Sequence, residues 1–363
     1  MRILFVNSIS ANKFGGGEQW MVKAAKGLMD AGHKVFVASK RGAEILRVAH
    51  RAAVPTRVFN IRADFSPLNT WRIARFLTHE RIEVLVCNLN KDVRVAGLAA
   101  RLVHTPAVVA RHGVLLCARK WKHKVTLTNL VDSILTNTQS IKQAYDGYGW
   151  FGDGFVKVVY NGIEDKSHVP PYDFARDFPG KKVIFSAGRL TPQKGFVDLI
   201  RAASRLAEKR RDFALVIAGQ GRQEDELKAL ASSLGLEAVV HFWGFRDTID
   251  PLLKGCDLFV LASHFEGMPN VVMEAMAAGK PVIATDVNGA RELMVPESTG
   301  RIVPPRDPAA LAAAIAALLD DAHLRREFGR QGLQRVQTHF TIPLMVQNLE
   351  QYFSSLLNAH EKP

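Results

Sequence analysis

The sequence has few cysteines and no long apolar run. Its 363 residues include three cysteines, Cys87, Cys117 and Cys256, and none of them forms a Cys-x-x-Cys pair. This spacing argues against a disulfide framework and against a zinc site, so we expect three buried thiols. No apolar run reaches the roughly 18 residues that a transmembrane helix needs.

The composition is otherwise that of a folded, water-exposed protein. Hydrophobic residues make up 47% of the chain and charged residues 23%, which is typical of globular domains. The length suffices for two domains, each with its own core. The first residues, MRILFVNS, read as a strand and not as a signal peptide. We therefore expect a cytoplasmic protein.

Acidic residues are scarce in the first half of the chain. Residues 1–170 contain 25 Lys and Arg against 12 Asp and Glu, whereas the remaining residues contain 23 of each, so the first half carries the whole net charge of +13. The excess favours an acidic partner, such as an anionic lipid surface, a phosphorylated acceptor or nucleic acid; a basic domain without such a partner is the alternative. Because we find no helix-turn-helix, zinc-finger or RNP-type pattern, we do not expect a nucleic-acid partner.

Short apolar segments alternate with helical patterns along both halves of the chain. We expect strands at 2–7, 34–38, 57–60, 84–87, 107–110, 133–136 and 156–160, and then at 183–186, 215–218, 239–242, 257–262 and 281–285. This alternation predicts doubly wound, mainly parallel sheets, in which ligands bind beyond the carboxyl ends of the strands. Residues 165–180 are polar and proline-rich, which predicts a linker.

Three glycines, Gly15, Gly16 and Gly17, lie between the first strand and a helix expected over 20–29. Glycines let the backbone approach a ligand closely at a helix N-terminus, as phosphate-binding loops do. The segment, SISANKFGGGE, is neither a G-x-G-x-x-G pattern nor a Walker loop. By itself it is therefore a weak sign of ligand binding.

Two glutamates, Glu266 and Glu274, flank the start of a helix expected from Pro269 to Ala278 and ended by Gly279. The free N–H groups and positive dipole end of such a helix attract anions. Eight helical residues span roughly 12 Å, so one ligand touching both carboxylates must be long, as a sugar joined to a nucleoside through two phosphates is. An ordinary crossover helix with two solvated glutamates is the alternative.

Cations and a histidine follow other strands. Arg189 and Lys194 lie in the loop after the strand at 183–186, where two cations can hold a diphosphate. Arg111 and His112 follow the strand at 107–110. A neutral imidazole with a pKa near neutrality can hydrogen-bond a sugar hydroxyl or position an acceptor, although a lone histidine is more often structural or exposed.

A basic segment comes directly after His112. Residues 115–124 read LLCARKWKHK and place four cations, Arg119, Lys120, Lys122 and Lys124, around Trp121. Such a segment can lie on an anionic membrane, where each cation contributes on the order of 1 kcal/mol. A solvated basic loop is the alternative.

These motifs resemble those of the retaining glycosyltransferases of family four. Residues 266–284 read EGMPNVVMEAMAAGKPVIA, close to that family's Glu-x7-Glu signature, and residues 188–195 read GRLTPQKG, close to its GRLxxxKG pattern. The resemblance implies an α/β protein of GT-B fold, with two Rossmann-like doubly wound parallel-sheet domains facing a central cleft. It implies an acceptor-binding domain at 1–165 joined by a C-terminal helix at 341–363, a linker at 166–181 and a nucleotide-sugar-binding domain at 182–340.

The resemblance also assigns roles to residues. It implies that Glu266, His112, Arg189 and Lys194 take part in catalysis, with Glu266 at the sugar hydroxyls and Arg189 and Lys194 at the donor pyrophosphate. Glu274 is expected to accept hydrogen bonds from the ribose. Further donor contacts are expected from Gly16, Gly17, Gly267, Met268, Asn270 and Val271. The acceptor or membrane side is expected to comprise Arg111, Arg119, Lys120, Trp121, Lys122 and Lys124.

The implied activity is retaining transfer of a sugar from a UDP-, GDP- or ADP-sugar to a saccharide or lipid-linked saccharide, in lipopolysaccharide or other cell-envelope polysaccharide synthesis. Since no Asp-x-Asp motif follows a suitable strand, we expect no cofactor and no metal requirement. Peripheral contact with the inner face of the plasma membrane fits the basic segment. A sugar-nucleotide epimerase of the same fold and a catalytically silent scaffold for membrane or polysaccharide are the alternatives.

Overall fold

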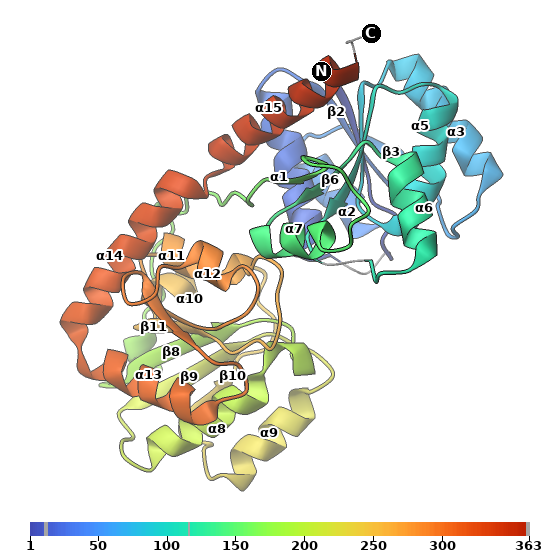
Figure 1. Cartoon of the computed structure of the whole chain (residues 1–363). Coiled ribbons are helices and arrows are strands. Elements are labelled where there is room, and N and C mark those ends of the chain that lie inside the picture. Colours follow the sequence, from blue (N-terminus) through green and yellow to red (C-terminus); the bar gives the residue numbers. More distant parts are fainter. Residues whose placement is uncertain (11–13, 115–116, 361–363) are drawn as a thin grey trace. The chain divides into compact units, whose positions relative to one another are not determined.

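The structure is a computed structural model that describes residues 1–10, 14–114 and 117–360. The chain forms two compact units (Figure 1). Unit 1 contains residues 1–162 and 342–363, and unit 2 contains residues 163–341. The proline-rich segment expected to be a linker belongs to unit 2 and contains one short 3-10 helix, η2 (Phe174–Arg176).

Unit 1 is built on a parallel sheet of seven strands in the order β3-β2-β1-β4-β5-β6-β7. The strands are β1 (Arg2–Val6), β2 (Lys34–Ser39), β3 (Thr56–Val58), β4 (Val84–Cys87), β5 (Ala107–His112), β6 (Ser133–Thr136) and β7 (Val156–Val158). The strands β4 and β6 are buried along their whole length, as expected for strands covered on both faces.

Helices cover both faces of this sheet. They are α1 (Gly16–Asp30), α2 (Glu44–Arg51), α3 (Pro67–Glu80), α4 (Asn90–Asp92), the π-helical turn η1 (Val93–Gly97), α5 (Leu98–Leu102), α6 (Trp121–Leu130), α7 (Gln139–Asp146) and α15 (Ile342–His360). The last helix, α15, packs against α1 and buries Leu349 and Phe353 in the core on that face (Figure 1). The C-terminal segment is therefore part of the first unit's core.

Unit 2 is built on a parallel sheet of six strands in the order β10-β9-β8-β11-β12-β13. The strands are β8 (Lys182–Ala187), β9 (Phe213–Ala218), β10 (Val240–Phe242), β11 (Leu258–Leu261), β12 (Val282–Thr285) and β13 (Gly300–Val303). Its helices are η3 (Pro192–Lys194), α8 (Phe196–Ala207), α9 (Glu224–Ser233), α10 (Asp250–Gly255), α11 (Asn270–Ala277), α12 (Ala290–Leu293), α13 (Pro308–Asp320) and α14 (Ala322–His339).

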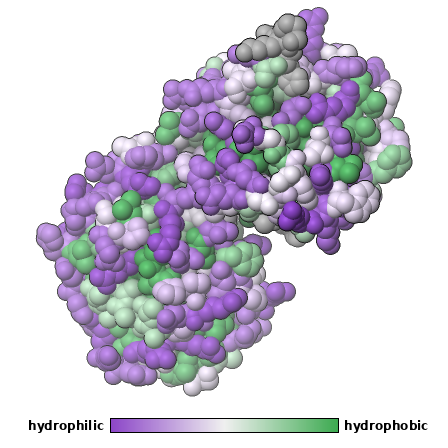
Figure 2. All heavy atoms as spheres, in the orientation of Figure 1, coloured by the Kyte–Doolittle hydropathy of each residue, from purple (hydrophilic) through white to green (hydrophobic). Residues whose placement is uncertain are grey.

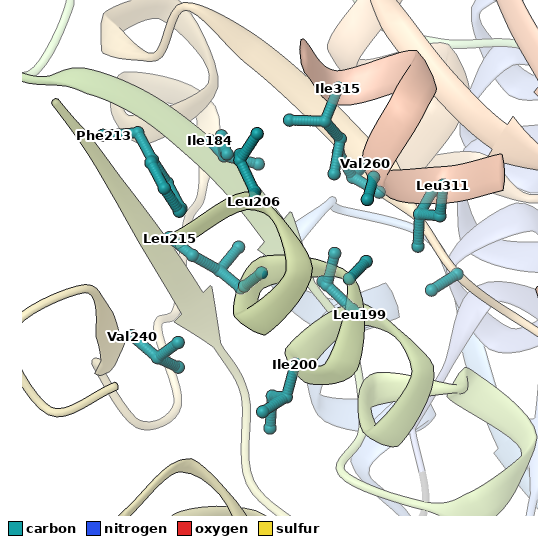
Figure 3. Close-up of a cluster of buried hydrophobic side chains, with 14 of the residues drawn as sticks. Ile184, Leu199, Ile200, Leu206, Phe213, Leu215, Val240, Val260, Leu311 and Ile315 are labelled. Carbon is teal, nitrogen blue, oxygen red and sulfur yellow. The ribbon is translucent and has the colours of Figure 1, made fainter. Parts of the chain in front are cut away.

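The core of unit 2 fills the space between this sheet and helices α8 and α13. Figure 3 shows Leu199 and Leu206 of α8 pointing toward the strands, with Leu311 and Ile315 of α13 beside them. The spacing of these leucines and isoleucines places them on one face of each helix. On the face shown in Figure 2, hydrophilic residues cover most of both units, with hydrophobic residues scattered among them.

The expected architecture, two doubly wound parallel-sheet domains, is confirmed. The limits of several elements differ from the expectation. Strand β5 extends to His112, so Arg111 and His112 lie within it and not after it. Helix α1 begins at Gly16, and the expected basic loop becomes helical at Trp121. The strand β13 was not expected, because its four residues, GRIV, carry a short and partly polar pattern.

Further expectations concern the cysteines, two loop segments and membrane-spanning helices. The three cysteines are free and buried, as predicted. Residues 11–13 of the glycine-rich segment and residues 115–116 of the basic segment lie outside the described residues. Among the helices described here, none is long and apolar enough to cross a membrane.

Candidate functional site

A connected cluster of polar side chains in unit 2 lies where strands β8 and β11 end. These strands are neighbours at the centre of the sheet, and the chain runs outward from β8 in one direction and from β11 in the other. The loops that follow them therefore diverge, and this is the point of a doubly wound sheet where ligands bind. The first loop, residues 188–195, carries Arg189 and Lys194; the second, residues 262–269, carries Glu266.

An ion pair joins the two loops. Lys194 Nζ lies 2.5 Å from Glu266 Oε1, and the hydroxyl of Ser263 donates to the same oxygen at 2.7 Å. The Lys194 and Glu266 side chains are 16% and 11% exposed, so the pair is shielded from water but still reachable. Because both donors bind Oε1, the other carboxylate oxygen, Oε2, is the one that can accept a hydrogen bond from a ligand.

Further hydrogen bonds hold the same loops together. His264 donates its backbone N–H to the carbonyl of Gln193 at 2.8 Å, and the Gln193 side-chain amide donates to the carbonyl of Phe265 at 3.0 Å. The ring nitrogen Nε2 of His264 lies 2.7 Å from a carboxylate oxygen of Asp198 in α8. These three contacts fix the backbone around Lys194 and Glu266, so a ligand would meet a prearranged pair.

Glycine is needed where the loops cross other backbone. Gly195 has a φ of +64°, and a Cβ at this position would overlap the carbonyl oxygen of Ala262. A Cβ on Gly219, after β9, would likewise overlap the carbonyl oxygen of Gly188. Only glycine gives both the left-handed backbone and the close approach that bring these strand ends together.

Helix α11 begins beside Glu266, as expected. Pro269 precedes its first turn, and no side chain caps the free N–H groups there. Of the other expected donor contacts, Gly267 and Met268 are buried just before the helix, and Asn270 and Val271 are partly exposed in its first turn. The helix start therefore offers backbone donors next to the ion pair.

Glu274 lies one turn further along α11. It lines a small surface hollow together with residues Ile163, Glu164, Lys166, Asp250, Lys254, Ala277 and Ala278. Hydrogen bonding to Glu164 raises the pKa of Lys166, and Asp250 and Glu274 add to that effect. Glu274 thus has a cation of its own unit close by; its contact with a ribose stays a prediction.

In unit 1 the corresponding point of divergence lies between the neighbouring strands β1 and β4. Gly16 and Gly17 form the first turn of α1 and are not part of a loop. The buried carboxylate of Glu18 accepts the Gly15 N–H at 2.9 Å and the side-chain amide of Asn7, after β1, at 2.8 Å. Glu18 thereby ties the start of α1 to the end of β1.

Arg111 is a buried cation next to this helix start. It is 4% exposed, its guanidinium lies 4.3 Å from the ring centroid of Trp20, and Nη1 is 3.5 Å from the side-chain oxygen of Asn88. Burial lowers the pKa of Arg111 to about 10, with Glu18 acting in the opposite direction, so the group remains charged near neutral pH. Its expected place on a membrane side is wrong, because a buried guanidinium cannot reach a bilayer; contact with an acceptor stays a prediction.

His112 is fully buried, and its expected pKa near neutrality is wrong. Its Nδ1 lies 2.6 Å from the Tyr145 hydroxyl, and its Nε2 has no hydrogen-bond partner. Burial, with the nearby charge of Arg111, lowers the pKa of His112 to about 3. The imidazole is therefore neutral at physiological pH, with one buried polar atom that a ligand hydroxyl could satisfy.

The cations of the basic segment are exposed, and its residues from Trp121 onward are helical. Arg119 and Lys120 precede α6, and Trp121, Lys122 and Lys124 lie in its first turn. Trp121 is 79% exposed. The cations and the indole are thus available to a partner, as expected for a surface segment.

Sequence reasoning missed the residues that support these sites. In unit 2 they are Ser263, Gln193, His264 and Asp198; in unit 1 they are Glu18, Trp20, Asn88 and Tyr145. Most of them act through a partner far away in the sequence, which no local pattern marks; Ser263 and Glu18 also bind residues three positions away, Glu266 and Gly15. Across residues 1–10, 14–114 and 117–360, no three His, Cys, Asp or Glu side chains form a group that could hold a metal ion.

Comparison with known proteins links both units to one family. The family profile described as "Glycosyl transferases group 1" matches residues 172–335, and the profile "Glycosyltransferase Family 4" matches residues 14–167. A lipopolysaccharide core biosynthesis mannosyltransferase of Rhizobium meliloti, LpsB, is 31% identical over 312 residues, which cover 82% of each chain. A lipopolysaccharide core biosynthesis glycosyltransferase of the same organism, LpsE, is 32% identical over 212 residues, covering 58% of this chain and 60% of that one.

Solved structures share the fold. The crystal structure of Anabaena HepE in complex with UDP-glucose has a TM-score of 0.84 and 24% identity, and covers 98% of this chain and all of that chain. At this identity the likeness shows the fold alone. The chain spans 50% to 60% of the length of several curated relatives that it matches.

The burial of His112 predicts a pH-dependent contribution to stability. Its folded-state pKa of about 3 lies below the ordinary value of 6.5, so below about pH 6.5 the unfolded chain binds a proton that the folded chain does not. Relative to His112→Gln, we expect the wild-type chain to lose about 2–3 kcal/mol of unfolding free energy between pH 7 and pH 4.5. Urea unfolding of both proteins at the two pH values measures this difference; an unchanged difference would contradict the assignment of a buried neutral imidazole.

Proposed function

Because the chain belongs to the glycosyltransferases of group 1, we propose that it transfers a sugar from a nucleotide-diphosphate sugar to a saccharide or lipid-linked saccharide. The names of the relatives LpsE and LpsB support an acceptor in lipopolysaccharide or related cell-envelope polysaccharide synthesis. The observation that carries the proposal is the pairing of Lys194 with Glu266 between the two loops of unit 2, beside the start of α11.

The donor would bind to unit 2 through its diphosphate. Arg189 offers a planar fork on an exposed part of the first loop, and Lys194 offers a compact charge at its end. The uncapped N–H groups of α11 add donors of the kind that bind phosphate at helix N-termini. Charge grows on the diphosphate as the bond to the sugar breaks, so these groups would stabilise the leaving group most strongly in the transition state.

Glu266 would bind the sugar. Its Oε1 is held by Lys194 and Ser263, so Oε2 can accept a sugar hydroxyl without a change in the position of the carboxylate. Through the shared ion pair, Glu266 also orients the ammonium group of Lys194 toward the ligand. Glu274, one turn later, is the proposed acceptor of ribose hydrogen bonds.

Unit 1 would bind the acceptor. Arg111 lies buried beside the start of α1 as a fixed positive charge for it. Gly16 and Gly17, which present backbone N–H groups in the first turn of α1, stay proposed contacts of the donor. His112, neutral at physiological pH, would hydrogen-bond a sugar hydroxyl through Nε2 and would not act as a charged acid.

We also propose that transfer retains the anomeric configuration of the donor and needs no metal ion. Positive charge for the leaving group would come from Arg189 and Lys194, in place of the metal ion that some other transferases use. With an identified donor and acceptor, NMR coupling constants of the product give the configuration, and a chelator tests the metal. Inversion, or loss of transfer in EDTA, would contradict this mechanism.

Binding to an anionic membrane is a further part of the proposal. Arg94 of η1 pairs with Asp64 at 2.6 Å and donates to Thr126 of α6 at 3.4 Å, so the segment before α3 lies beside α6. Each of these two segments presents an aromatic side chain to solvent: Phe65 is 77% exposed and Trp121 79%. Exposed aromatic rings among cations suit the interface of a bilayer with anionic headgroups.

The donor site predicts nucleotide binding that depends on Arg189. In a thermal-shift panel of UDP, GDP, ADP and CMP without metal, at least one diphosphate should raise the melting temperature, because a ligand of the folded state stabilises it. Replacing Arg189 with Met should weaken the binding of that nucleotide about tenfold, because one charge-assisted hydrogen-bonding group is lost. Arg201→Met, an exposed arginine on α8, is the matched control. Absence of a shift with every nucleotide, or equal weakening by both variants, would contradict the proposed donor site.

The membrane surface predicts lipid-dependent sedimentation. The full chain should sediment with vesicles that contain phosphatidylglycerol and much less with pure phosphatidylcholine vesicles. Charge reversal of Lys122, with Trp121→Ala, should reduce binding by tenfold or more, since each cation is worth about 1 kcal/mol and the indole adds to that. Lys157→Glu, on the edge strand β7, controls for net charge. Equal binding of all three proteins would remove the membrane from the proposal.

A further inference from the structure

Three cations of unit 1 come together at one edge of its sheet. Lys40 directly follows β2, Arg62 comes after β3, and Lys91 lies in α4 after β4. Strands β3, β2, β1 and β4 are consecutive neighbours and all parallel, so their carboxyl ends meet at the same edge. The edge includes the point between β1 and β4 where the chain diverges, which is where a ligand is expected.

Lys91 and Arg62 both lie close enough to Lys40 to act on it electrostatically. The pKa of Lys40 is lowered first by partial burial and then by Lys91 and Arg62, with only Asp92 opposing among the causes. Like charges that lie close together repel each other, so this arrangement costs free energy. Lys40 and Lys91 are partly buried where they lie, so the fold holds the repulsion in place.

The carboxylates nearby are committed to other groups. Asp92 is fully buried and accepts the backbone N–H groups of Ser8 and Leu89 at 3.1–3.2 Å. Burial raises the pKa of Asp92 to about 6, so its charge is costly where it lies. Asp64 pairs with Arg94 at 2.6 Å. In the described part of unit 1, these carboxylates therefore leave the three cations with excess positive charge.

We propose that Lys40, Arg62 and Lys91 bind a phosphate monoester carried by the acceptor saccharide. Three cations that approach from three separate connections suit a tetrahedral dianion with three terminal oxygens, whereas a planar carboxylate is matched better by one bidentate arginine. The acceptor is the source because the donor diphosphate has cations of its own, Arg189 and Lys194 in unit 2. The inference rests on the proposed sugar transfer and specifies its acceptor as a phosphorylated sugar.

The test uses glucose 6-phosphate as the probe, with glucose as its uncharged counterpart, at fixed ionic strength. All proteins are full-length and carry Arg189→Met, which weakens phosphate binding at the donor site. Titration followed by 31P NMR of glucose 6-phosphate gives its Kd, and calorimetry measures glucose. We expect glucose 6-phosphate to bind, glucose to bind at least tenfold more weakly, and inorganic phosphate to compete.

Single substitutions then identify the site. Lys91→Met and Lys40→Met should each weaken the binding of glucose 6-phosphate about tenfold, because each removes one charged contact to phosphate. Lys157→Met, the exposed lysine on β7, should leave the Kd within about twofold. Because removing a like charge relieves repulsion, both site variants should unfold at or above the melting temperature of the parent.

Two results would overturn the proposal. One is equal affinity for glucose 6-phosphate in the Lys91→Met and Lys157→Met proteins, and the other is equal affinity for glucose 6-phosphate and glucose. If a nucleotide diphosphate raises the melting temperature of the wild-type protein while either of these results is found, only the phosphate site is refuted. The proposed sugar transfer then stands. Phosphate binding that depends on Lys91, without any nucleotide shift, would support an anion site and remove the proposed donor chemistry.

Discussion

The ion pair between Lys194 and Glu266 joins two loops that would otherwise diverge from the centre of the sheet in unit 2. Parallel strands deliver the two residues to the same edge, but the strands after β8 and β11 lead away in opposite directions. Gly195 allows the first loop to turn against the carbonyl of Ala262. The hydroxyl of Ser263 donates to the same oxygen of Glu266 that Lys194 binds and so helps to hold the carboxylate. A cation and a carboxylate are thereby fixed next to a helix N-terminus before any ligand arrives, which reduces the cost of ordering them on binding.

Unit 1 uses the same kind of edge with a different chemistry. Its charged groups are either buried, as Arg111 and Asp92 are, or held near like charges, as Lys40 and Lys91 are. Both arrangements cost folding free energy, and ligand binding can offset that cost. His112 adds an unpaired ring nitrogen at full burial. The polar groups of this edge are thus arranged less for stability than for a ligand rich in hydroxyl and anionic groups.

The sequence predicts much of the framework because the framework is local. The strands Val84–Cys87 and Ser133–Thr136 match the expectation at both ends. The first is a continuous apolar run, and the second has an apolar pair between two β-compatible polar residues. Helix α11 was found from Pro269 at its start and Gly279 after its end. By contrast, α6 was missed because WKHKVTLTNL has few apolar residues to mark a buried face, and β13 because it is short.

The sequence singled out residues of the candidate site but not the connections between them. Lys194 and Glu266 stand 72 positions apart, and nothing in either loop shows that they pair with each other. The sequence also singled out His112, yet its pKa depends on how deeply Tyr145 and the surrounding core enclose it. Burial and pairing across the fold are properties of tertiary packing, so a motif gives the residue type without its electrostatic state.

The two joined loops of unit 2 would together form the nucleotide site. Hydrogen–deuterium exchange of the full chain, with and without the nucleotide diphosphate that binds best, tests this most directly. Binding should slow exchange in peptides that cover residues 188–195 and 263–274, since ligand contacts there would stabilise the backbone hydrogen bonds between the loops. Protection elsewhere, with both loops unchanged, would contradict the account.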